Sequence, residues 1–148
     1  MRIALYQPEI AGNVGAVLRL GACLGVAVDL IEPMGFAWDT ARVRRTAMDY
    51  IDHVEIARHA DWITFRAVCP GRLVLLTTKG TISLYEANFT SGDTLLIGQE
   101  SAGVPATIAA QCALALRIPI RPQVRSLNLA TAAALALGEA LRQTDQLP

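Results

Sequence analysis

The chain has 148 residues, of which 53% are hydrophobic and 18% are charged, a composition typical of a globular protein and not of a disordered one. A chain of this length fits a single domain, here residues 1–148, and can bury roughly two-thirds of the surface that the unfolded chain exposes. The formal net charge is zero, so any attraction to nucleic acid must come from charge concentrated locally.

Apolar strand patterns alternate with helical patterns along the whole chain. We expect strands over residues 2–6, 26–32, 53–57, 73–78, 93–98 and 115–118, and helices over 13–24, 60–68, 105–111 and 127–143, with a short arginine-rich helix from residue 39 or 40 to 48. Asn13 is expected to cap the first helix and Gly25 to end it. This alternation predicts an α/β domain with a mostly parallel sheet and helices on both faces.

The last helix is apolar on nearly all sides. Leu129, Ala133 and Leu137 belong to one face, but Ala134 and Leu135 extend the apolar surface around the helix. A helix of this kind is usually buried on most sides. In so small a domain the second covering surface can come from another subunit, so we expect a homodimer.

The sequence predicts neither secretion, nor a membrane span, nor a metal site. The longest apolar stretch, residues 127–141, is too short and too interrupted to cross a bilayer, and the N-terminus lacks a signal-peptide pattern. Cys23, Cys69 and Cys112 are widely separated and form no CxxC pair. We therefore expect a cytoplasmic protein with reduced thiols and no bound metal.

Three segments follow predicted strands, at positions where open α/β sheets tend to bind ligands. They are Asn13-Val14-Gly15-Ala16-Val17-Leu18-Arg19, then Gly98-Gln99-Glu100-Ser101-Ala102-Gly103-Val104-Pro105, and finally Ile118-Pro119-Ile120-Arg121 with Ser126-Leu127-Asn128-Leu129. Taken singly, they are explained as helix caps, turns and a surface arginine. None is a GxGxxG or a P-loop, so nucleotide triphosphate binding is unsupported.

Taken together, in this order and before an alanine- and leucine-rich helix, the segments resemble the three motifs of the SPOUT (trefoil-knot) superfamily of RNA 2'-O-methyltransferases. Further similarity lies in residues 5–10 and 31–39, in Arg44-Arg45 with Asp49-Tyr50, and in Thr77-Thr78-Lys79-Gly80. These segments resemble the tRNA (cytidine/uridine-2'-O)-methyltransferases that act on the wobble nucleotide of leucine tRNAs. The resemblance covers essentially the whole chain.

The resemblance implies a C-terminal trefoil knot, which composition and periodicity do not predict. It also implies that S-adenosylmethionine binds across the knotted loops, leaving S-adenosylhomocysteine as product, and that the active site forms across a homodimer interface. The matching cofactor positions are Leu76, Thr77, Gly98, Glu100, Gly103, Ile118, Ser126 and Leu127.

The resemblance assigns catalysis to Arg19, supported by Asn13, Glu100 and Asn128. Because a guanidinium is a very poor base, we expect Arg19 to stabilise the alkoxide that forms at the ribose 2'-oxygen. Candidates for contacts with RNA phosphates are Arg42, Arg44, Arg45, Arg58 and Arg121, with a solvated helix face as the alternative for the first three.

The sequence departs from the family pattern in places. Gln99 stands where proline is common, Ile120 and Leu127 replace methionines, and Gly138 and Leu141 replace aromatic residues. These departures leave the polar motif residues intact. Two alternatives stay open: a SPOUT enzyme for another tRNA or rRNA position, and a non-catalytic knotted RNA-binding homodimer, which would not need all the polar motif residues together.

Overall fold

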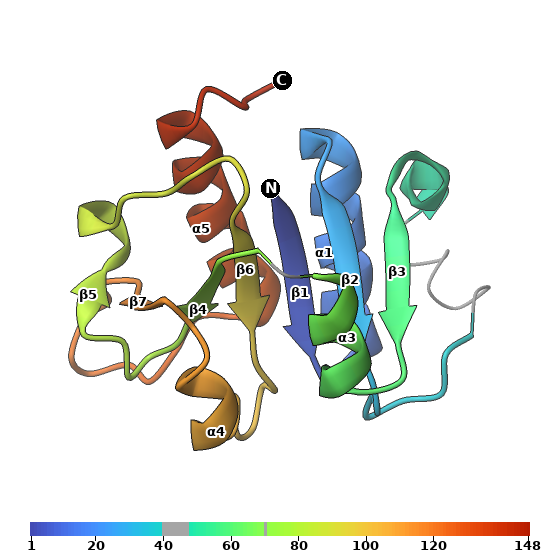
Figure 1. The fold of residues 1–148 in the computed structure, drawn as a ribbon, viewed down its shortest axis with the longest axis horizontal. Helices are drawn as coiled ribbons and strands as arrows, with labels where there is room; N and C mark the ends of the chain where they lie inside the picture. Colours follow the sequence, from blue (N-terminus) through green and yellow to red (C-terminus); the bar gives the residue numbers. More distant parts are fainter. Residues whose placement is uncertain (40–47, 70) are drawn as a thin grey trace.

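The computed structural model describes residues 1–39, 48–69 and 71–148, and its strands form one sheet in which every paired strand is parallel (Figure 1). The strands are β1 (Arg2–Tyr6), β2 (Ala27–Ile31), β3 (Ile56–His59), β4 (Leu73–Leu76), β5 (Ile82–Ser83), β6 (Thr94–Ile97) and β7 (Leu114–Arg117). Their order in the sheet is β3-β2-β1-β6-β4-β7-β5. The predicted α/β fold with a parallel sheet is confirmed.

Helices cover both faces of the sheet, also as predicted (Figure 1). The long helices α1 (Ala11–Leu24) and α5 (Leu129–Gln143) pack against each other on one face. The shorter helices α3 (Trp62–Val68) and α4 (Ala106–Ala109) lie on the other face. Two short 3-10 helices, η1 (Met48–His53) and η2 (Leu84–Glu86), complete the described elements.

The alternation of side chains along β1 divides the core into two layers. Ile3 and Leu5 are fully buried among side chains of α1 and α5. Ala4 and Tyr6 point to the opposite face and pack with Phe65 of α3. Burial on both faces explains the nearly continuous apolar sequence of the central strands.

The first helix begins earlier than expected, at Ala11, with Ile10 in the capping position and no side-chain cap. The prediction that Asn13 caps this helix is therefore wrong. Asn13 lies inside the first turn, and its side-chain amide donates a hydrogen bond to Glu100 in the loop after β6. Gly25 ends the helix in the left-handed conformation, with φ 66°, as predicted.

The third strand is shifted toward the C-terminus relative to the expected 53–57, because residues up to His53 belong to η1. β5 was not predicted, because its two residues are too few to show an alternating pattern. The helix expected from residue 39 or 40 to 48 falls largely outside the described residues.

In the single chain α5 is buried along one face only. Ala133, Ala136, Leu137 and Ala140 are fully buried, whereas Leu135 is 41% exposed. Among the described residues, no helix combines the length and the apolar character needed to cross a membrane.

An ion pair fixes the amino edge of the sheet, by which we mean the edge where the strands begin. Asp93 precedes β6, is fully buried, and accepts hydrogen bonds from Arg72 Nε at 2.7 Å and Nη2 at 2.6 Å. It also accepts bonds from the backbone and hydroxyl of Thr90. Burial raises the pKa of Asp93, but the bonds from Arg72 and Thr90 outweigh it and hold the pKa below its ordinary value.

Candidate active site

The carboxyl edge, where the strands end, brings together four of the predicted cofactor positions, Leu76, Thr77, Gly98 and Ile118. Leu76 at the end of β4 is paired with Ile97 of β6 on one side and with Leu116 of β7 on the other. Thr77, Gly98 and Ile118 each follow one of these three adjacent strands. The strand order therefore places three loops side by side that are far apart in the sequence.

The loop after β4 passes directly over the end of β7. Thr77 donates its backbone N–H to the carbonyl of Leu116 at 2.9 Å. A Cβ on Gly80 would lie 2.4 Å from the carbonyl carbon of Leu116, so only glycine allows this approach. Arg117 Nη1 then donates to the carbonyls of Gly80 at 3.1 Å and Thr81 at 2.8 Å.

The loop after β6 folds back on itself. Gln99 and Gly103 exchange two backbone hydrogen bonds, of 3.0 and 2.9 Å. Gly103 has φ +71°, which favours glycine, and a Cβ on Gly98 would lie 2.3 Å from the carbonyl carbon of Gly103. This closed turn holds Glu100 at its tip.

Glu100, Asn13 and Asn128 form one chain of hydrogen bonds, which we call the motif network. Asn13 Nδ2 donates to Glu100 Oε1 at 2.9 Å, and Asn128 Nδ2 donates to Asn13 Oδ1 at 2.9 Å. Asn128 Oδ1 accepts the backbone N–H groups of Ala130 and Thr131 and so caps α5, where the sequence allowed either Ser126 or Asn128 as the cap. The structure thus joins all three motif segments.

Glu9, which precedes the first motif segment, is bonded to the second one, and no role was predicted for it. Its carboxylate accepts the backbone N–H of Ser101 at 2.8 Å and the hydroxyl at 2.7 Å. Its own backbone N–H donates to Glu100 Oε2 at 2.9 Å. The bonds from Ser101 lower the pKa of Glu9. Similarity in residues 5–10 was the only signal that could have indicated it.

Arg19 lies on the exposed side of α1, nearly two turns after Asn13. Its guanidinium carbon is 4.9 Å from the centre of the Tyr50 ring, within the range of a cation–π contact. The aromatic ring of η1 therefore orients the predicted catalytic arginine.

Three arginines line a hollow of about 420 Å³ beside the loop after β7. We call it the arginine hollow; it is lined by Thr78, Arg117, Ile118, Pro119, Ile120, Arg121, Pro122, Val124 and Arg125. Two predicted site residues, Ile118 and Arg121, therefore share one hollow. Ser126 and Leu127 follow it as exposed residues that lead to Asn128.

Arg58, another predicted phosphate-binding residue, is not brought to this place. Arg58 belongs to β3, five strands away from β7, which corresponds to roughly 24 Å across the sheet. Its guanidinium bonds Glu32 at 2.6 and 2.9 Å and lies over the Trp38 ring. Arg42, Arg44 and Arg45 lie outside the described residues.

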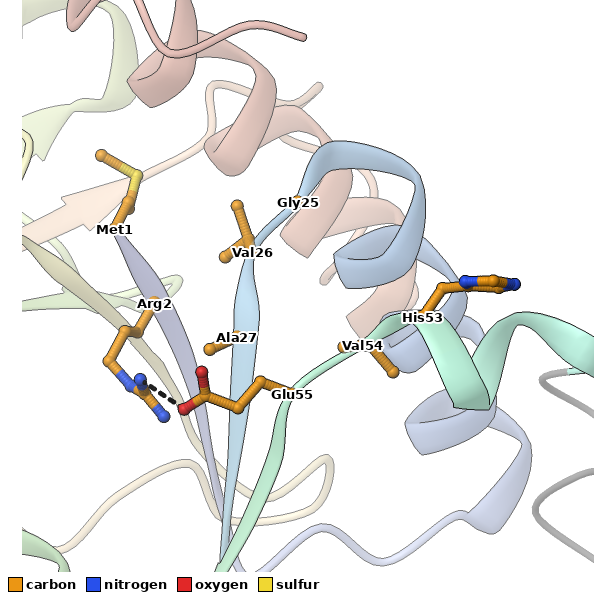
Figure 2. A pocket seen from close by; sticks show the side chains of 8 residues that line it. All are labelled: Met1, Arg2, Gly25, Val26, Ala27, His53, Val54 and Glu55. Carbon is orange, nitrogen blue, oxygen red and sulfur yellow. Dashed lines mark hydrogen bonds and ion pairs between the residues drawn. The ribbon is translucent and has the colours of Figure 1, made fainter.

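A second hollow, of about 330 Å³, lies at the amino edge and contains none of the predicted site residues. In Figure 2 the side chains of Arg2 and Glu55 point toward each other across it, joined by a 3.0 Å hydrogen bond. Arg2 also bonds the buried Asp29, whose other neighbour is His59, 2.8 Å away. The bond to Asp29 raises the pKa of Arg2, and its guanidinium is already bonded to both carboxylates.

Comparison with known proteins links this geometry to one family. The model of the SpoU rRNA Methylase family matches residues 1–138. A tRNA (cytidine(34)-2'-O)-methyltransferase of Beijerinckia indica subsp. indica is 49% identical over 148 residues, which cover 98% of this chain and 92% of that protein.

Two solved structures extend the comparison. One, described as giving structural insights into the 2-OH methylation of C/U34 on tRNA, has a TM-score of 0.91 and 42% identity, over 96% of this chain and 94% of that chain. An AdoMet-bound rRNA methyltransferase from Sinorhizobium meliloti has a TM-score of 0.84 and 27% identity, over 95% of this chain and 55% of that chain.

Proposed function

This chain belongs to the SpoU rRNA methylase family, and from that premise we propose that it methylates the 2'-hydroxyl of nucleotide 34, the wobble cytidine or uridine of tRNA. The observation that carries the proposal is the motif network, which joins Asn13, Glu100 and Asn128 from three distant segments. A protein that only bound RNA would not need these three polar side chains bonded to one another beside the ends of three adjacent strands.

The carboxyl edge fits S-adenosylmethionine, which would supply a methyl group on a cationic sulfonium. Three neighbouring strand ends present backbone groups there, and Gly80 and Gly98 allow the loops to approach closely. The residues that we assign to the cofactor are Leu76, Thr77, Gly98, Glu100, Gly103, Ile118, Ser126 and Leu127. Family membership also implies the trefoil knot in this part of the chain.

The acceptor is a ribose hydroxyl, which is a poor nucleophile until its proton leaves. We assign Arg19 to stabilising the negative charge that develops on the 2'-oxygen, because its guanidinium holds its protons too firmly to act as a base. The ring of Tyr50 holds that guanidinium in place before the substrate binds. Asn13, Glu100 and Asn128 fix the loops that shape the site.

We infer that the enzyme acts as a homodimer through the open side of α5. Leu135 is 41% exposed and Ile10, before α1, is 52% exposed. Sedimentation velocity tests this inference: the wild type is expected at twice the chain mass, and Leu135→Glu is expected to shift it toward the monomer. A wild type that sediments as a monomer would exclude the dimer.

The finer assignments rest on the resemblance. We propose leucine isoacceptors as the substrates and the cytoplasm as the place of the reaction, since tRNA is available there. Arg121 is the described arginine best placed to contact RNA beside the cofactor loop. Arg58 is a weaker candidate, because its charge is already matched by Glu32.

Incubation with methyl-labelled S-adenosylmethionine and unmodified tRNA tests the function directly. Label is expected on the ribose of nucleotide 34, which mass mapping of nuclease fragments identifies. Label at another position would show that the enzyme belongs to the same family but modifies a different nucleotide. The absence of methyl transfer by a folded protein that binds S-adenosylhomocysteine would contradict the enzymatic proposal.

A further inference from the structure

The arginines in the described residues differ in what surrounds them. Arg2, Arg58, Arg72 and Arg142 each bond at least one carboxylate. The arginine hollow is different, because Arg117, Arg121 and Arg125 surround it and its described lining contains neither aspartate nor glutamate. Four arginines are thus paired with carboxylates, whereas the three arginines of the hollow have no acidic residue in its described lining.

Such a gathering is unfavourable unless an anion binds, since like charges around one hollow repel each other. The hollow is nevertheless held together, because Arg117 Nη1 donates to the carbonyls of Gly80 and Thr81. Each guanidinium keeps further donors, and their planar fork matches the oxygens of a phosphate. The arrangement therefore favours an anionic ligand with several oxygens.

We propose that Arg121 and Arg125, with Arg117 behind them, bind a backbone phosphate of the RNA substrate close to the ribose that is methylated. The site lies on the loop that begins at the predicted cofactor residue Ile118 and ends at Asn128 of the motif network. A phosphate held there would place the neighbouring sugar beside the strand ends. This inference rests on the proposed function.

The matched control is Arg142→Gln, which removes one positive charge outside the arginine hollow. Arg142 lies in the last turn of α5, and its neighbour Gln143 bonds Phe89, a residue that precedes β6 at the amino edge. Arg121→Gln, Arg125→Gln and Arg142→Gln are compared by equilibrium binding of an unmodified tRNA transcript between 50 and 200 mM salt, with S-adenosylhomocysteine binding measured in parallel.

We expect Arg121→Gln and Arg125→Gln each to weaken tRNA binding by about tenfold, the usual loss for one hydrogen bond to a charged group. The slope of log Kd against log salt should fall by about 0.7 to 0.9 for each lost phosphate contact. S-adenosylhomocysteine affinity and the tRNA affinity of Arg142→Gln should stay at the wild-type level. Arg125→Lys, which keeps the charge, should retain most of the salt slope.

Two results would overturn the proposal. One is equal tRNA affinity and salt slope in the hollow variants and in Arg142→Gln. The other is weaker S-adenosylhomocysteine binding with unchanged tRNA binding, which would assign the hollow to the carboxylate of the cofactor. Methyl transfer by the wild type to nucleotide 34 of the same transcript is scored separately, so a failure of the proposed function is recognised without reference to the arginines.

Discussion

The two edges of the sheet differ in how their polar and charged side chains are paired. At the amino edge, the buried carboxylate of Asp93 is matched by both nitrogens of the Arg72 fork. At the carboxyl edge, Asn13, Glu100 and Asn128 bond one another near the surface, and the adjacent arginine hollow has no acidic side chain in its described lining. Compensated charge stabilises the fold, whereas polar groups at the carboxyl edge remain available to a ligand.

The strongest test of this difference is Arg19→Ala. We expect methyl transfer to fall by about a thousandfold, because the loss of one group that stabilises a developing oxyanion costs up to that much. Single-turnover transfer of labelled methyl to tRNA measures the rate, and calorimetry should show unchanged S-adenosylhomocysteine binding. Tyr50→Leu, which removes only the orienting ring, should cause a smaller loss. Wild-type activity in Arg19→Ala would refute the assigned role.

Asp93→Asn should have the opposite effects to Arg19→Ala, with a large loss of stability and little change in the methyl-transfer rate. The free energy of unfolding should fall by about 2 kcal/mol, less than for a fully buried pair because Arg72 is partly exposed. Urea unfolding measures the change, and S-adenosylhomocysteine affinity under native conditions should not move.

The pH dependence of Asp93 has a defined sign. Its pKa is lowered on folding, so its stabilisation is present above the unfolded-state value of about 3.9 and is lost as the pH falls through the lower folded value. Asp93→Asn should therefore lack this part of the acid destabilisation. An unchanged acid unfolding curve would contradict the role given to the pair.

Asn128 belongs to both kinds of region, since it caps a helix and bonds the motif network. Asn128→Ala should lose about 1 kcal/mol of stability from the missing cap and most of the activity. Asn128→Ser keeps a capping oxygen but lacks the amide nitrogen that donates to Asn13, so it should regain stability without regaining the rate. If Asn128→Ser regains the rate together with stability, the bond to Asn13 has no catalytic value.

Glu9→Gln should give the smallest effect, a loss of about threefold in the methyl-transfer rate, because a neutral amide replaces the charged group that accepts both bonds from Ser101. The pKa of Glu9 is lowered, so its contribution is present above about pH 4.3 and is lost only as the pH falls through the lower folded value. The rate ratio of wild type to variant should therefore stay constant from pH 6 to 8. Ser101→Ala, which removes only the hydroxyl bond, is the control.

Local patterns predicted much of the fold, but the asparagine before the first helix was wrongly predicted to be its cap. Asn13 stands before an amphipathic stretch, where asparagine is a good cap, yet it bonds Glu100 instead. Nothing in its neighbours along the chain could reveal that choice, because the partner is 87 residues away. The link between Glu9 and Ser101 was missed for the same reason.

Neighbouring residues along the chain were enough to predict the alternation of strands and helices, the end of α1 at Gly25 and the three motif segments. The last helix begins at Leu129, two residues later than the predicted 127, because Asn128 caps it. The folded sheet places β6 between β1 and β4 and β7 beside β4, and only this order makes the three segments meet. Strand order depends on burial and pairing summed over the whole sheet, which no local pattern records.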